Sequence, residues 1–168
     1  MEALGKLRSA FEKDGTVTAG NASGINDGGA AVVLTRASVA QAHGLQGGMQ
    51  LEAVATAAME PHLMGYAPVP ALEKLFAMTG TTPKDIGIVE LNEAFASQAV
   101  AVIRDAGLDP EKTNPYGGAI ALGHPVGATG TMLSVRVLKH LQRSNDELGI
   151  VTMCIGGGQA LAALFRRI

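Results

Sequence analysis

The sequence has one cysteine, no tryptophan and few charged residues, and each shortage excludes a class of protein. With Cys154 as the sole cysteine of 168 residues, an internal disulfide framework and a zinc cluster of paired Cys-x-x-Cys motifs are excluded. Six aromatic residues and a formal net charge of −2 supply neither stacking platforms nor a basic surface, so we expect no nucleic-acid partner. The apolar runs are far shorter than the roughly 20 residues of a membrane span, so we expect no membrane partner either.

Glycine and apolar residues are the abundant types. The chain has 22 glycines, 47% hydrophobic residues and 17% charged residues, which is too apolar for a disordered chain. Its length suits one domain of roughly 100–200 residues. The first residues alternate charged and apolar side chains instead of forming a signal peptide, so we expect a cytoplasmic protein.

Apolar residues at helical spacing predict several helices. Gly44 and Gly80 are placed to end two of them, and Thr82-Pro83 is a capping pair that opens one short helical turn. Long loops are expected where glycine, proline, serine and asparagine gather. The predicted helices cover residues 1–11, about 36–43, 71–79, 94–106 and 128–143; the predicted loops cover 16–29, 61–70 and 114–130.

Short apolar runs between these helices predict strands. Glycines 156–158 lie between the last two runs, which are therefore expected to form an antiparallel hairpin. Strands that alternate with helices predict an α/β fold: layered, with a mixed five-stranded sheet and helices on both faces. The predicted strands cover residues 30–35, 49–58, 86–91, 150–155 and 159–165.

Three polar sites are not required by the core pattern: Asn92-Glu93, His124 and Cys154. Reactive groups in α/β proteins gather at the carboxyl ends of strands, which favours a functional interpretation. Each site also has a structural alternative, because Asn92 can cap the following helix and Cys154 can be an inert core thiol. His124 is harder to explain structurally, since it follows a glycine-rich segment where small residues allow close backbone approach.

Three motifs occur in order: Asn-Glu-Ala-Phe at 92–95, Gly-His-Pro at 123–125 and Cys-Ile-Gly at 154–156. Together they resemble the C-terminal domain of a thiolase, an acetyl-CoA acyltransferase. The segments 20–28, 64–70 and 117–125 are similar to further signatures of that family. The resemblance covers nearly the whole chain, so we expect one thiolase C-terminal domain over residues 1–168, with a helix and a CoA-side loop in residues 1–29.

The resemblance implies a role for each matching residue. His124 would activate a nucleophilic cysteine and help to bind the thioester oxygen, and Asn92 would position a water in the same oxyanion hole. Cys154 would be the acid/base at the α-carbon, and the backbone N–H of Gly156 would serve a second oxyanion hole. The implied CoA-contacting residues are Ser23, Ala94, Phe95 and Met64. No metal and no further cofactor are implied, because the coenzyme A thioester is the substrate; the role of Glu93 stays open.

One departure from the family pattern decides what to expect of this chain alone. The acyl-accepting cysteine of a thiolase belongs to its first half, whereas the only cysteine here is in the Cys-Ile-Gly motif. We therefore expect the chain to need an N-terminal thiolase half as a partner, to be inactive by itself, and to form a homo-oligomer. Two alternatives remain: a subunit of a split thiolase, and a non-enzymatic acyl-CoA- or lipid-binding module of the same fold.

Overall fold

The computed structural model describes residues 2–168, which are built around one four-stranded mixed sheet. The strand order is β1-β4-β3-β2; β2 and β3 run parallel, and the other two pairs are antiparallel. The strands are β1 (Met49–Ala58), β2 (Ile88–Leu91), β3 (Leu148–Ile155) and β4 (Gln159–Arg167). The predicted hairpin is confirmed, because β3 and β4 pair from Leu148↔Arg166 to Ile155↔Gln159.

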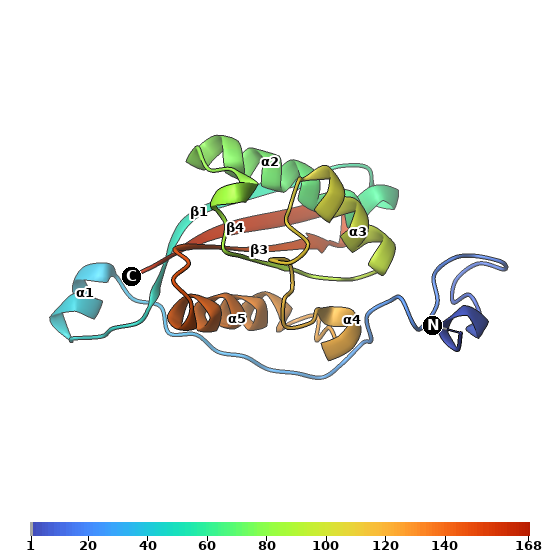
Figure 1. The fold of residues 1–168 in the computed structure, drawn as a ribbon, viewed down its shortest axis with the longest axis horizontal. Helices are drawn as coiled ribbons and strands as arrows, with labels where there is room; N and C mark the ends of the chain where they lie inside the picture. The colour runs from blue at the N-terminus through green and yellow to red at the C-terminus, as the bar shows by residue number, and fades with distance from the viewer. Residues whose placement is uncertain (1) are drawn as a thin grey trace.

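Helices cover both faces of this sheet, so the layered α/β fold is confirmed. Figure 1 shows α2 and α3 on one face and α4 and α5 on the other. The first face buries the larger apolar cluster, which includes Leu72 and Leu75 of α2; the second buries Val137 and Leu141 of α5. The helices are α1 (Ala37–Ala42), α2 (Pro68–Thr79), α3 (Ala96–Asp105), α4 (Ala119–Leu122) and α5 (Thr129–Arg143). The 3-10 helices are η1 (Leu4–Lys6), η2 (Pro61–Tyr66), η3 (Pro83–Asp85) and η4 (Gly156–Gly158).

Local signals end and begin these elements as expected, with one exception. Gly80 adopts a left-handed conformation (φ 69°) after α2, and Thr82 and Asp85 cap η3 reciprocally. The loop predicted over residues 61–70 is wrong, because η2 occupies most of it and α2 already begins at Pro68. Proline is tolerated there, since the first helical residues have no intrahelical acceptor for an N–H.

The expected five-stranded sheet is also corrected, because residues 30–35 form no strand. They run exposed along the outside of α5, and Val33 and Leu34 are 92% and 88% exposed. A strand needs a neighbour for its backbone groups, and residues 2–168 supply none to this segment. Similarly, of the helix expected over 1–11 only the turn η1 forms among the described residues. Phe11 is 74% exposed, so no apolar face is buried to stabilise a longer helix.

Candidate active site at the ends of β2 and β3

The parallel pairing of β2 and β3 brings two of the predicted site residues to one edge of the sheet. Leu91, the last residue of β2, is opposite Thr152, and the Asn92 N–H donates to the Thr152 carbonyl (3.0 Å). Cys154 lies two residues further along β3 and is buried. The backbone of Asn92 and Cys154 is therefore fixed by sheet hydrogen bonds, not by flexible loops. This rigidity suits a site that must hold reacting groups in place.

His124 reaches the same edge from the glycine-rich segment. Its Nε2 lies 3.4 Å from the Asn92 Nδ2, and its Nδ1 lies 2.7 Å from the Thr129 Oγ1 at the start of α5. Its backbone N–H donates to the Asn26 Oδ1 (3.0 Å). Gly123 is required at the preceding position, because its φ is +97° and a Cβ there would lie 2.6 Å from the same Asn26 oxygen. His124 is thus held at its backbone by Asn26 and at its ring by Thr129.

The hydrogen-bond directions assign the tautomer of His124. The Thr129 hydroxyl donates to the Pro125 carbonyl (2.9 Å), so its oxygen accepts the proton of His124 Nδ1. The lone pair of the neutral ring is then on Nε2, facing the Asn92 amide N–H group. Burial lowers the pKa of His124, which favours this neutral form at pH 7. His124 is therefore built to accept a proton at Nε2.

The Asn92 side chain is buried and only half satisfied. It is 1% exposed, and its Oδ1 has no hydrogen-bond partner among residues 2–168. An unpaired buried acceptor costs about 1–3 kcal/mol, so a donor supplied by a bound molecule would be favourable there. Asn92 does not cap α3, which begins only at Ala96 with Phe95 as its N-cap. The capping alternative for Asn92 is thus excluded.

Cys154 and Gly156 lie on the neighbouring strand and turn. Burial raises the pKa of the Cys154 thiol, which therefore keeps its proton at neutral pH. Among residues 2–168, no hydrogen bond joins this thiol to His124 or Asn92. A Cβ at Gly156 would meet nothing within 4 Å, whereas one at Gly158 (φ +90°) would lie 2.1 Å from the Met59 carbonyl oxygen. Packing within the chain thus requires glycine at 158 but not at 156.

The loop expected beside CoA contacts the Asn92–Phe95 motif directly. The N–H and the Oγ of Ser23 both donate to the Ala94 carbonyl, at 3.0 and 3.3 Å. Ala22 forms an isolated antiparallel bridge with Phe95. Met64 is half-buried in η2, which packs against η4, β3 and α3. Three of the four residues expected at CoA are therefore brought together, and Met64 lies on η2, the element that packs against the Gly156–Gly158 turn.

Sequence reasoning missed two residues that hold His124. Asn26 accepts the His124 backbone N–H, and Thr129 accepts its ring N–H. Asn26 lies almost 100 positions earlier in the chain, so nothing local pairs the two. Thr129 is five residues from His124, at the N-terminus of α5, where a hydroxyl is usually interpreted as a cap.

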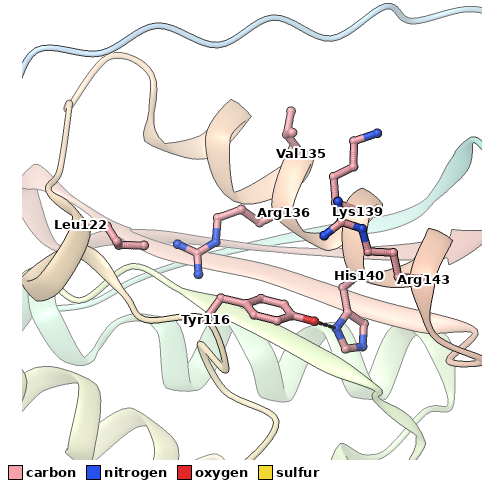
Figure 2. A pocket seen from close by; sticks show the side chains of 7 residues that line it. All are labelled: Tyr116, Leu122, Val135, Arg136, Lys139, His140 and Arg143. Carbon is pink, nitrogen blue, oxygen red and sulfur yellow. Dashed lines mark hydrogen bonds between the residues drawn. The ribbon is translucent and has the colours of Figure 1, made fainter.

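A surface pocket of about 300 Å³ lies away from the predicted site. Figure 2 shows Arg136 extending from α5 toward Leu122 and Tyr116, and the Tyr116 hydroxyl bonded to the His140 Nδ1 (3.0 Å). None of the predicted site residues lines this pocket. Across residues 2–168, no helix is both long and apolar enough to cross a membrane, and no three His, Cys, Asp or Glu side chains are grouped as a metal site requires.

Known families and proteins match almost the whole chain. The profile "Thiolase, C-terminal domain" matches residues 45–167, and "Thiolase, N-terminal domain" matches residues 1–38. The chain is 50% identical over 167 residues to the acetyl-CoA acetyltransferase of Escherichia coli (strain K12), covering 99% of the chain and 42% of that protein. It is 49% identical over 162 residues to the 3-ketoacyl-CoA thiolase of Bacillus subtilis (strain 168), covering 96% and 41%.

Solved structures agree with these matches. The Bacillus anthracis acetyl-CoA acetyltransferase superposes with a TM-score of 0.96 at 41% identity, over 99% of this chain and 42% of that one. Human mitochondrial 3-ketoacyl-CoA thiolase in complex with CoA superposes with a TM-score of 0.90 at 36% identity, with the same coverage. The chain spans less than half the length of these relatives. Given the profile over residues 45–167 and the conserved fold, this chain belongs to the thiolase family.

Proposed function

We propose that this chain supplies the C-terminal half of an active site that transfers acyl groups between CoA thioesters by reversible Claisen condensation. The observation that carries the proposal is the pairing of the Asn92 amide with the basic nitrogen of His124 (3.4 Å) beside the end of β3, where Cys154 lies. Two hydrogen-bonding groups and a thiol at one sheet edge are what thioester enolate chemistry needs.

His124 is the base in this proposal. Its neutral Nε2 takes the proton of a nucleophilic thiol, and the imidazolium that results stabilises the thiolate. With that proton on Nε2, the ring then donates to the thioester oxygen. The bond from Nδ1 to Thr129 keeps the ring oriented through both steps. Each correctly placed donor at a developing oxyanion contributes about 3 kcal/mol.

Asn92 supports the same oxyanion through a water. The buried Oδ1 that lacks a partner among residues 2–168 is an acceptor for one water proton, and the water then directs its other proton to the thioester oxygen. Because the Asn92 backbone is fixed to Thr152, the position of this water relative to His124 is set by the sheet.

Cys154 is the acid/base at the α-carbon of the acyl acceptor. Its thiol first gives its proton to the CoA thiolate that leaves the acyl donor, and the Cys154 thiolate so formed removes the α-proton of the acceptor, which leaves the enolate. In the reverse direction the thiol returns that proton when a 3-ketoacyl thioester is cleaved. Its raised pKa makes the thiolate a strong base. The backbone N–H of Gly156 serves the second oxyanion hole, and the open space around its Cα leaves room for a thioester there.

Coenzyme A is the proposed ligand of the loop that carries Ser23. The contact between Ser23 and Ala94 joins this loop to the Asn92–Phe95 motif, so both segments would contact the same part of the CoA arm, and Met64 would contact it from η2. The relative described as a complex with CoA supports this choice of ligand.

The chain should need a second thiol from outside its 168 residues. Cys154 is its sole cysteine, and acyl transfer through a covalent thioester requires a nucleophile distinct from the α-carbon base. We therefore expect no thiolysis of acetoacetyl-CoA by the chain alone. We expect activity when it is co-expressed with the part of the Escherichia coli relative that it does not match.

The matched variants are His124→Ala and Cys154→Ala, which should each abolish the reconstituted activity, and Cys154→Ser, which should nearly do so. Turnover by the chain alone would show that the missing-nucleophile argument is wrong. A chain that binds acyl-CoA in calorimetry but gives no turnover in the reconstituted pair would favour the alternative of a binding module.

A further inference from the structure

Glu93 follows Asn92 directly, and its carboxylate contacts the segment that leads to His124. Its Oε1 accepts a hydrogen bond from the Asn114 side-chain amide (2.9 Å), and its Oε2 accepts one from the Ile120 backbone N–H (3.2 Å). Asn114 also uses its side chain to bond both the N–H and the carbonyl of Leu91, at 2.9 and 2.8 Å. The carboxylate therefore joins the end of β2 to residues 114–120.

The segment contacted by Glu93 ends at the candidate base. Ile120 is the second residue of α4, a single turn that finishes at Leu122, and Gly123 and His124 follow it. The N-cap of α4, Gly118, has no side chain to satisfy the helix N–H groups, so the Glu93 carboxylate does so from another strand. A four-residue helix is too short to orient itself, and its direction depends on such external contacts.

Gly118 shows that the site is built around this carboxylate. A Cβ at position 118 would lie 2.1 Å from the Glu93 Cδ, although the φ of Gly118 (−108°) is open to any residue. The glycine is therefore needed to admit Glu93, not to form the turn. No Lys, Arg or His among residues 2–168 pairs with this carboxylate, so its acceptor oxygens serve neutral N–H groups only.

A second connection from the same strand reaches the same segment. Glu90 of β2 pairs with the Arg136 Nε (3.0 Å), and the Arg136 guanidinium donates to the Gly117 carbonyl. Figure 2 shows Arg136 directed from α5 toward this region. Residues 117–120 are thus held by Arg136 on one side and by Glu93 on the other.

We propose that Glu93 is a positioning residue whose carboxylate sets the location of His124 relative to Asn92. Asn92 is covalently joined to Glu93, and His124 is four residues beyond the Ile120 N–H that Glu93 accepts. The 3.4 Å distance between the Asn92 Nδ2 and the His124 Nε2 therefore depends on this link. The inference rests on the proposed function, because only the pairing of these two side chains gives the link a role in catalysis.

The test replaces Glu93 by glutamine, which keeps the size but turns one acceptor oxygen into a donor. That NH2 group must face either the Asn114 amide or the Ile120 N–H, so one of the two hydrogen bonds is lost. Long-range ¹H–¹⁵N spectra of histidine-labelled protein report the tautomer and the pKa of His124. We expect the pKa of His124 to rise, because the ring becomes more exposed. In a separate hydrogen-exchange measurement, we expect the Ile120 amide to exchange about tenfold faster, because it has lost its acceptor.

The matched control is Glu73→Gln, the same chemical change on the exposed face of α2, which should leave the His124 signals unchanged. A Glu93→Gln protein with a lower Tm but unaltered His124 signals would show a merely structural residue and overturn the proposal. If that variant does not fold, Gly118→Ala replaces it, since its methyl group displaces the same carboxylate; unaltered His124 signals there would also overturn it. Because these readouts need no turnover, an inactive reconstituted wild type would count against the proposed function alone.

Discussion

Replacing Glu90 by glutamine should change how the stability of this protein depends on pH. The Glu90 carboxylate is completely buried in β2, and its sole charged contact within 4 Å among residues 2–168 is Arg136. Burial raises its pKa from 4.5 to about 7; the attraction of Arg136 opposes this increase, and the charge of Glu93 adds to it. The carboxylate therefore carries a penalty for being ionised in the folded protein.

The sign and size of the effect follow from the two pKa values. Between pH 4.5 and about 7, the folded protein keeps a proton that the unfolded chain releases, so stability is lost as the pH rises through this window. The difference corresponds to about 3 kcal/mol, at ~1.4 kcal/mol per pH unit, and most of it is lost between pH 5 and pH 7. Glutamine does not titrate, so the variant lacks this loss.

The assay is urea unfolding followed by circular dichroism at pH 5, 6, 7 and 8. We expect the free energy of unfolding of the wild type, minus that of Glu90→Gln, to fall by about 2–3 kcal/mol across this range. The loss of the Arg136 partner adds a constant offset, and the other titrating groups cancel in the difference. A difference that does not vary with pH would mean that Glu90 ionises at its ordinary pKa, and the burial argument would be refuted.

Three further predictions concern packing, reactivity and assembly. Gly158→Ala should lower the free energy of unfolding by at least about 2 kcal/mol in urea titrations, whereas Gly156→Ala should change it by less than about 0.5 kcal/mol, because only Gly158 has a positive φ and a backbone oxygen in the way. Mass spectrometry should find Cys154 nearly unmodified by iodoacetamide at pH 7 and increasingly modified at alkaline pH; fast alkylation at pH 7 would contradict its burial and raised pKa. Light scattering should show a dimer or larger assembly, and serine at Val33 and Leu34 should reduce it, since these side chains are exposed; a monomer at high concentration would contradict this.

Much of the fold was predictable because local signals and tertiary packing agree. The apolar runs of β1, β3 and β4, the glycine at the end of α2 and the Thr82–Asp85 cap each act within a few residues. The prediction of a strand over residues 30–35 was wrong because the local signal and the tertiary packing disagree there. Its apolar pattern is typical of a strand, but strand formation needs a partner, and no other part of residues 2–168 pairs with it.

For the candidate site, too, the local features were predictable and the contacts between distant segments were not. The types of its residues were readable in the sequence, because Asn-Glu-Ala-Phe, Gly-His-Pro and Cys-Ile-Gly are local motifs. Their mutual arrangement was not readable, since it depends on contacts across the chain: Asn26 with His124 over 98 positions, and Glu93 with Ile120 over 27.

The sequence by itself thus determined the chemical groups, the family and the order of most elements, all of which are properties of nearby residues. Only the tertiary structure decided that the basic nitrogen of His124 faces Asn92, because its tautomer depends on Thr129 and Pro125. The tertiary structure also determined that the Glu93 carboxylate contacts Asn114 and Ile120. Hydrogen bonds between distant segments are specified by the packing of the whole domain, and a pattern of residue types along the chain does not contain them.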